Sequence, residues 1–464
     1  MYIYIIASLV IAALCALAKS RTMVRALSAV FVAFQIGFGV FIACNQFEAQ
    51  STMFFTFDHL GMMFYFVMAI IAALAFHISS DYLDKDELHQ FKIYTISMLL
   101  LCTSSACLYF SNNVAVTWIF LEITTLCTAG LVYHKRGMKS LEATWKYIFV
   151  CSVGISMAYL GILIISSHAH GDISYLSLVD AVMSGDPFYM KVAFLLVMTG
   201  YSCKMEIFPL FTVGIDANYA APTPASAVIS TVLVNSGFVA MFRIVEIFRH
   251  SEIWSWCSNL LIVIGVLSVA IGALYIRRTN NYKRLLAYST TENMGLVMIA
   301  MALGGIGTIA ALIHVVVHSM IKGGMFTLIS QIGKLYGSYR INRIGNYAKV
   351  NPMGAAAIFV GALSLTAFPP SGLFVSEVML FSGLISERKW WLVAVIIALL
   401  CVVIYSILER IIQLCFRNNN IERVDTTKFS KLTTFGAVAL IVVALAIGAL
   451  QPALFTDYIL SIVQ

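Results

Sequence analysis

Apolar runs long enough to cross a membrane alternate with short polar segments along nearly the whole chain. A helix needs about 17–25 apolar residues to cross a hydrocarbon core of about 30 Å. We therefore predict an all-α, polytopic membrane protein with about 14 transmembrane helices and a single transmembrane domain over residues 1–464. The predicted spans lie near residues 2–18, 24–44, 54–77, 92–109, 113–133, 143–166, 191–213, 222–247, 258–277, 284–303, 306–331, 353–385, 390–413 and 432–450.

The composition agrees with this interpretation. Hydrophobic residues make up 61% of the chain and charged residues 11%, whereas soluble domains are about 45–50% apolar and about 25% charged. The first run lacks a basic region before it and is followed at once by another run. We expect it to be a span and not a cleaved signal peptide.

The net charge of +7 carries information about topology. Basic residues in the loops of a membrane protein mark the cytoplasmic side. Here they follow odd-numbered spans, so we predict an inner-membrane (cytoplasmic-membrane) protein with both termini on the non-cytoplasmic side, and no nucleic-acid partner. The basic residues that carry this prediction are Lys19, Arg21, Lys135, Arg136, Lys139, Arg277, Arg278, Lys334, Arg340, Arg343, Arg417, Arg423 and Lys428.

Two of the predicted spans are interrupted by proline. Proline removes a backbone hydrogen bond, and within a membrane such breaks persist only inside protein or around a water-filled cavity. Paired broken spans are typical of transporters built from repeats. The breaks are five spans apart, which predicts an inverted repeat of two five-helix units, at about 91–250 and about 256–414, between N-terminal helices (about 1–90) and a C-terminal helix (about 430–452). The break residues are Pro209, Pro222, Pro224, Pro369 and Pro370.

Ionisable residues within the spans are the candidate functional groups. Charges in a bilayer are costly, at about 2.5–3.5 kcal/mol on insertion scales, and they commonly mark ion or proton pathways. The candidates are Glu122, Lys146, Lys204 and Glu377. For Lys146, and for Asp58 near a span start, two interpretations stay open, because lysine can reach the interface and aspartate can cap a helix.

The stretch ALIHVVVHSMIKGG at residues 311–324 places His314, His318 and Lys322 four residues apart. On a helix these side chains share one face and are separated by about 6 Å. Free imidazole has a pKa of about 6.5, so it exchanges protons near neutral pH. We interpret the three residues as a proton path through intervening waters.

The ten cysteines form no C-x-x-C pair. Their closest spacing, Cys102 to Cys107, matches no metal or cluster signature. We expect the cysteines to be small buried side chains, and we expect no cofactor in this chain.

Several stretches resemble a known family, the antiporter-like proton-pumping membrane subunits shared by respiratory complex I, membrane-bound NiFe hydrogenases and multisubunit Na+/H+ antiporters. The resemblance covers most of the chain. It is carried by FLEITTL around Glu122, KMEIFPLF around Lys204, AAPTPASA, NYKRLLAYSTTENMGL, HVVVHSMIKGGMF and FPPSGLFVSE. Within the family, WKYIFVCSVGISMAYLG and the run ENMG are most similar to hydrogenase-4 component F.

The resemblance implies roles for individual residues. Glu122 and Lys204 match the charged pair of a first half-channel. Glu377 matches an exit-side group in the second broken helix, and the His314–Lys322 ladder matches the central connection. Asn235 stands in the proton path where many relatives carry lysine, and Phe211 and Asn218 stand in place of histidines.

The expected function is a proton-translocating subunit of a redox-driven complex, of the hydrogenase-4/formate hydrogenlyase or complex I type. The expected partners are other membrane subunits, a hydrophilic hydrogenase or quinone-reducing module with iron–sulfur subunits, and lipids. Such a subunit catalyses no redox chemistry itself. Three alternatives stay open: a structural subunit with a weakened channel, a subunit of a multisubunit Na+/H+ antiporter, and a stand-alone antiporter.

Overall fold

A computed structural model describes the chain except for residues 46–51, 170–171, 419–429 and 464. Within the described ranges it is helical and contains no β-strand beyond isolated bridges. Ten of the described helices are long and apolar enough to cross a membrane. Arg423 and Lys428, two of the residues used to predict orientation, lie outside the described ranges.

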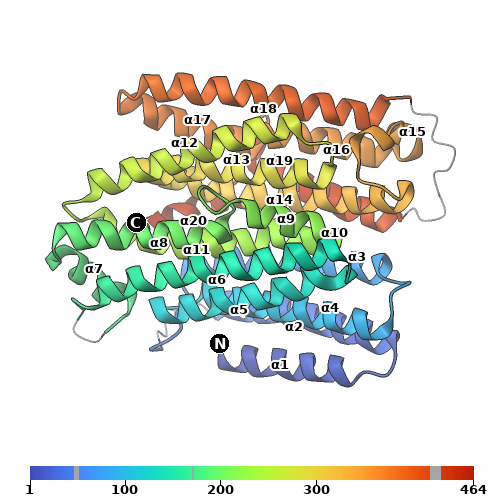
Figure 1. The fold of residues 1–464 in the computed structure, drawn as a ribbon, viewed down its shortest axis with the longest axis horizontal. Coiled ribbons are helices and arrows are strands. Elements are labelled where there is room, and N and C mark those ends of the chain that lie inside the picture. Colours follow the sequence, from blue (N-terminus) through green and yellow to red (C-terminus); the bar gives the residue numbers. More distant parts are fainter. Residues whose placement is uncertain (46–51, 170–171, 419–429, 464) are drawn as a thin grey trace. The chain divides into compact units, whose positions relative to one another are not determined.

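The chain forms two compact units, Met1–Leu260 (unit 1) and Leu261–Gln464 (unit 2), with the division inside helix α12 (Trp254–Arg278). Figure 1 labels the helices and colours them along the sequence. Those of unit 1 before α12 are α1 (Tyr2–Leu17), α2 (Arg21–Cys44), α3 (His59–Tyr82), α4 (Leu88–Tyr109), α5 (Val114–Val132), α6 (Met138–Ser166), α7 (Tyr175–Ser184), α8 (Pro187–Met205), α9 (Thr212–Ala220), α10 (Thr223–Val228) and α11 (Val234–Arg249). Those of unit 2 after α12 are α13 (Tyr282–Leu303), α14 (Ile306–Tyr336), α15 (Tyr347–Val350), α16 (Pro352–Leu365), α17 (Gly372–Ser386), α18 (Trp390–Phe416), α19 (Lys431–Leu450) and α20 (Ala453–Val463).

Short polar side chains start many of these helices. A side-chain oxygen at the residue before a helix can accept a hydrogen bond from a backbone N–H of the first turn that has no partner within the helix. Asn113 accepts one from Ala115 at the start of α5, and Asn281 accepts two at the start of α13. Ser371 caps α17 in the same way. These caps fix the helix starts next to the candidate functional residues.

The prolines lie at helix ends. Residues 206–211, with Pro209, separate α8 from α9, and Pro222 precedes α10, in whose first turn Pro224 lies. In unit 2, residues 366–371, with Pro369 and Pro370, separate α16 from α17. The predicted spans 191–213 and 353–385 are therefore each divided into two helical pieces.

Within unit 1, α6 runs alongside α8 in close contact (Figure 1). A Cβ at Gly200 of α8 would lie 2.3 Å from the Gly154 carbonyl oxygen of α6. Only glycine permits this approach, which brings the end of α8 close to α5 and α6. The end of α8 is where Lys204 lies.

Candidate functional site

Lys204 and Glu122 are joined by a hydroxyl in unit 1. Lys204 is fully buried, and its Nζ donates to Thr125 Oγ1 at 2.8 Å and to Thr124 Oγ1 at 3.2 Å. Thr125 Oγ1 in turn donates to Glu122 Oε2 at 3.3 Å. We call Glu122, Thr124, Thr125 and Lys204 the unit 1 cluster. It links an amine and a carboxylate through a hydroxyl that can rotate.

The position of Lys204 follows from close helix packing. A Cβ at Gly237 of α11 would lie 2.8 Å from the Lys204 carbonyl carbon, so the backbones of α11 and α8 meet at this residue. The ammonium also lies over the Tyr147 ring, 5.6 Å from its centroid. An aromatic face attracts a cation, most strongly where water is excluded. A lysine held in this way inside apolar helices is a candidate for proton transfer.

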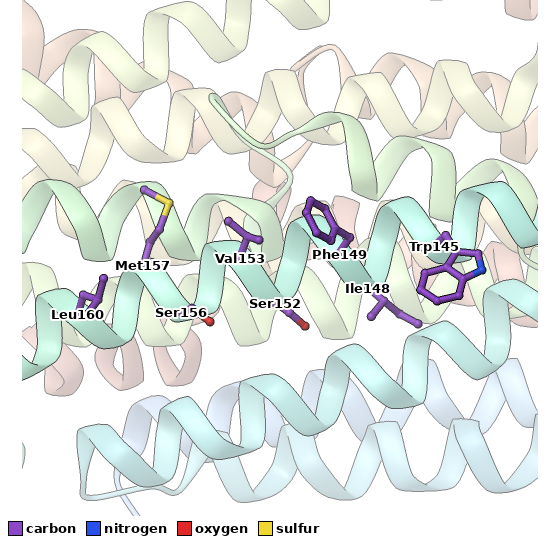
Figure 2. Close-up of a pocket in the computed structure, with 8 residues that line it drawn as sticks. All are labelled: Trp145, Ile148, Phe149, Ser152, Val153, Ser156, Met157 and Leu160. Atoms are coloured by element: carbon purple, nitrogen blue, oxygen red, sulfur yellow. The ribbon is translucent and has the colours of Figure 1, made fainter.

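Glu122 lies beside an open groove on α6. The groove has a volume of about 470 Å³ and is lined along one helix by Trp145, Ile148, Phe149, Ser152, Val153, Ser156, Met157 and Leu160 (Figure 2). Ser152 Oγ donates to Glu122 Oε1 at 2.9 Å. The half-buried carboxylate therefore contacts a residue of the groove on one side and the buried lysine, through Thr125, on the other.

Lys146 is a different kind of lysine. It is exposed on α6 and forms an ion pair with Glu142, one turn earlier in the same helix. Exposed pairs of this type contribute little to stability. The position fits the alternative interpretation that stayed open for it, a lysine near a span end.

Asn235 lies at the start of α11 and is fully buried. It lies two residues after a π-helical turn, Ile229–Leu233. Such turns leave carbonyls partly unsatisfied and are frequent at functional sites. Here the Val232 carbonyl accepts hydrogen bonds from the hydroxyls of Tyr109 and Ser236.

In unit 2 the buried lysine and the first histidine of the ladder bond to α13. Lys322 is fully buried and donates from Nζ to the Leu286 carbonyl and to Ser289 Oγ. His314 is buried, with Nε2 3.1 Å from Asn293 Oδ1 and Nδ1 3.0 Å from Ser376 Oγ. We call Ser289, Glu292, Asn293, His314 and Lys322 the unit 2 cluster.

Asn293 is the centre of that cluster. Its Nδ2 donates to the Ser289 carbonyl at 2.8 Å and to the carboxylate of Glu292. Its Oδ1 is therefore the acceptor for His314, and His314 Nε2 carries the proton in this arrangement. Glu292 is buried and is electrostatically coupled to both Lys322 and Glu377.

His318 lies between the other two ladder residues along α14 and is fully buried. Neither ring nitrogen has a hydrogen-bond partner among the described residues. It is electrostatically coupled to His314 and Lys322. The three ladder residues are thus on one helix without direct hydrogen bonds between them.

Glu377 is half-buried on α17. Its neighbour Ser376, and not Glu377 itself, contacts His314. Glu377 is therefore next in sequence to a residue that contacts the unit 2 cluster.

Asp58 caps a helix, as its sequence position allowed, and also forms an ion pair. Its Oδ1 accepts from the Gly61 N–H at 2.9 Å at the start of α3, and its Oδ2 accepts from Arg243 Nη2 at 2.8 Å. Arg243 is buried, also bonds the Tyr109 and Ser111 carbonyls, and lies over the Tyr175 ring. The Arg243 guanidinium is thus held by a carboxylate, two backbone carbonyls and an aromatic ring.

Comparison with known proteins gives a consistent result. A model of the family described as NADH:quinone oxidoreductase/Mrp antiporter, TM matches residues 111–404, more than half of the chain. The hydrogenase-4 component F homolog of Methylacidiphilum infernorum is 29% identical over 314 residues, 66% of this chain and 66% of that protein. Hydrogenase-4 component B of Escherichia coli is 26% identical, over 72% of this chain and 51% of its own length. The chain thus spans about two thirds of the first relative and about half of the second.

Another relative is matched over a larger share of its own length. NADH-quinone oxidoreductase subunit N of Trichlorobacter lovleyi is 25% identical over 88% of this chain and 83% of that protein. Among solved structures, a chain of the membrane-bound sulfane sulfur reductase, an archaeal respiratory membrane complex, has a TM-score of 0.86 at 22% identity, covering 99% of this chain and 95% of its own. A chain of the Mrp complex from Dietzia sp. has a TM-score of 0.83 at 18% identity, with coverages of 99% and 95%. At these identities the structural likeness concerns the fold alone.

Proposed function

Because this chain belongs to the NADH:quinone oxidoreductase/Mrp antiporter family of membrane subunits, we propose that it translocates protons as one subunit of a redox-driven membrane complex. The parent complex is of the hydrogenase-4/formate hydrogenlyase type or a relative of complex I. The observation that carries the proposal is the fully buried Lys204, joined to the half-buried Glu122 through Thr125. A buried lysine with hydroxyl partners that can rotate is suited to gain and lose a proton.

In this proposal unit 1 and unit 2 each contain one half-channel of an inverted repeat, within about 14 spans. Glu122 and Lys204 form the pair of the first half-channel. His314, His318 and Lys322 form the central connection, and Glu377 is the exit-side group. Asn235, beside the π-helical turn, stands at the link to the first half-channel, where water completes the path.

The energy for transport comes from outside the chain. The proposed partners are other membrane subunits, surrounding lipids and a hydrophilic hydrogenase or quinone-reducing module with iron–sulfur subunits. In this proposal the redox cofactors belong to those partner subunits. It lies in the inner membrane with both termini on the non-cytoplasmic side.

The parent complex is identified by purifying the tagged chain from native membranes in mild detergent and determining its partners by mass spectrometry. A NiFe hydrogenase large subunit supports the hydrogenase-4 type, and quinone-reducing subunits support a relative of complex I. Partners that are all antiporter subunits would replace the redox-driven part of the proposal with a multisubunit antiporter.

Proton translocation is tested in inverted membrane vesicles that contain the whole complex, driven by the electron donor of the identified partner. We expect Lys204→Ala and Lys322→Ala to abolish proton uptake, followed with a pH-sensitive dye, while the complex remains assembled. The matched control is Lys146→Ala, which removes an exposed lysine. Uptake at the wild-type rate in both buried-lysine variants would leave a structural subunit as the function.

A further inference from the structure

Glu206 is a buried carboxylate without a role in the proposal above. It is 1% exposed and directly follows the last residue of α8. Its backbone is left-handed, with φ 57° and ψ 35°. This conformation favours glycine, and residues with a Cβ adopt it at a cost in free energy. A carboxylate therefore occupies a position where glycine would be both less strained and free of a buried charge.

Helix α9 accommodates this side chain in two ways. Asn218 Nδ2 donates to Glu206 Oε1 at 2.8 Å. Gly214 leaves the space that the side chain fills, because a Cβ there would lie 2.4 Å from Glu206 Cγ and 2.5 Å from Cδ. One face of α9 thus supplies both a hydrogen-bond donor and a gap for the carboxylate.

The Asn218 amide can serve both protonation states of Glu206. Its NH2 group donates to a carboxylate, and after rotation its oxygen accepts from a carboxylic acid. Asn218 is fully buried, and its Oδ1 has no hydrogen-bond partner among the described residues. This unused acceptor next to a carboxylate is the group that a protonated Glu206 would need.

Glu206 is also close in sequence and structure to the unit 1 cluster. Lys204 precedes it by two residues, and α9 packs against α5, α6 and α8. The titratable side chains on these helices include Glu122, Cys127, Lys146, Tyr147, Cys151, Tyr201, Cys203, Lys204, Asp216 and Tyr219. The helices packed around Glu206 are therefore the ones that carry the unit 1 cluster.

We propose that Glu206 is a proton-carrying site of unit 1, which binds a proton and releases it in each turnover. Asn218 alternates between donor and acceptor, and Gly214 leaves room for the side chain. In this step an O–H bond forms on the carboxylate as one breaks in a hydrated proton, and no electrons are transferred. The proposal rests on the proton translocation proposed above and adds a residue to its first half-channel.

The first test is Glu206→Gln in the whole complex. Glutamine has the same shape and its oxygen still accepts from Asn218, so a structural role would be retained, but it cannot bind the proton. We expect proton uptake in inverted vesicles to fall at least about tenfold, as is typical when a proton-transfer group is lost. Glu206→Asp, which restores a carboxyl group, should recover part of the rate.

The second test is Glu206→Gly, measured for stability and for proton uptake. Glycine relaxes the left-handed backbone and removes a buried carboxylate. We expect proton uptake to fall as it does in Glu206→Gln, with little change in the melting temperature of the purified chain, because relief of the backbone opposes the loss of the Asn218 hydrogen bond. A fall in melting temperature with normal uptake would assign Glu206 a structural role and overturn the inference.

Protonation itself can be observed by infrared spectroscopy of the purified full chain over a range of pH. We expect a carbonyl band of a protonated carboxylic acid that disappears in Glu206→Gln and shifts in Asn218→Leu. Glu377→Gln is the control and should retain the band. A spectrum that Glu206→Gln leaves unchanged at every pH overturns the inference.

The two proposals fail in different ways. Normal uptake in Lys204→Ala would reject proton translocation by this chain and the inference with it. Normal uptake in Glu206→Gln beside an inactive Lys204→Ala would reject only the role of Glu206.

Discussion

The two units hold their buried lysines in contrasting ways. Lys204 of unit 1 is bonded to two threonine hydroxyls, and the linked Glu122 contacts a serine of an open groove. Lys322 of unit 2 donates hydrogen bonds to the backbone carbonyl of Leu286 and to the hydroxyl of Ser289, both in helix α13. Hydroxyls rotate at low cost, whereas a backbone carbonyl is fixed by its helix. Both of these partners of Lys204 can therefore rotate, whereas one of the two partners of Lys322 cannot.

The two clusters also differ in how their polar groups share hydrogen-bond partners. Glu122 and Lys204 each have a second partner besides Thr125, namely Ser152 and Thr124. In unit 2, one amide, Asn293, serves the Ser289 carbonyl, Glu292 and His314 together. Loss of one connecting side chain should therefore lower the stability of the chain less in the unit 1 cluster than in the unit 2 cluster.

The largest effect is expected for Asn293→Leu. The substitution removes a partner from three buried polar groups, and each group left unsatisfied costs about 1–3 kcal/mol. We expect a large fall in the melting temperature of the purified chain, followed by tryptophan fluorescence, and loss of proton uptake. The control is Met294→Leu at the next buried position, a change that conserves volume and costs less than about 1.5 kcal/mol. Equal melting temperatures in both variants would remove the contrast between the clusters.

A second effect separates function from stability within unit 2. His318→Met removes a buried ring whose nitrogens have no hydrogen-bond partner among the described residues, so no such bond is lost. We expect an unchanged or higher melting temperature and a fall in proton uptake of at least about tenfold, because a proton-transfer group is lost. Normal uptake would instead mean that protons pass from Lys322 through Ser289 and Asn293 to His314 without using His318.

A smaller effect is expected for Thr125→Val in unit 1. Valine has the shape of threonine without the hydroxyl that joins Glu122 to Lys204. Because both groups keep another partner, stability should change by about 1 kcal/mol, the typical worth of one hydrogen bond. Proton uptake should fall several-fold. Thr128→Val is the control in the same helix, since the Thr128 hydroxyl makes no hydrogen bond among the described residues, and it should leave uptake unchanged.

The sequence predicted the charged members of these clusters and missed the groups that connect them. Glu122, Lys204 and Lys322 stand out because a charge inside an apolar run is costly and rare. Glu292 carries the same signal and could have been predicted. Thr125, Ser289 and Asn293 carry none, because hydroxyl and amide residues are common in spans and their partners depend on which helix faces which.

The fold, too, could be predicted from the sequence only in part. Helical, membrane-spanning structure follows from the apolar runs, and the prolines indicated where the predicted spans 191–213 and 353–385 are divided. The π-helical turn before Asn235 carries no local sequence signal, because it depends on Tyr109 from another helix, whose hydroxyl bonds the Val232 carbonyl. The left-handed Glu206 is likewise set by its surroundings, since its own residue type disfavours that conformation.

The smallest effect is expected for Lys146→Ala, which tests whether burial or merely charge defines the unit 1 cluster. Lys146 is on α6 like Ser152, yet its ammonium is exposed and paired with Glu142 one turn away. Such an exposed pair contributes little to stability and is screened by salt. We expect a melting temperature within about 1–2 °C of wild type and normal proton uptake at low and high salt. A loss of uptake comparable to that of Lys204→Ala would extend the proton path onto the exposed face of α6. The main difference between the unit 1 and unit 2 clusters would then be the hydroxyls that connect their charged groups, and not the exposure of those groups.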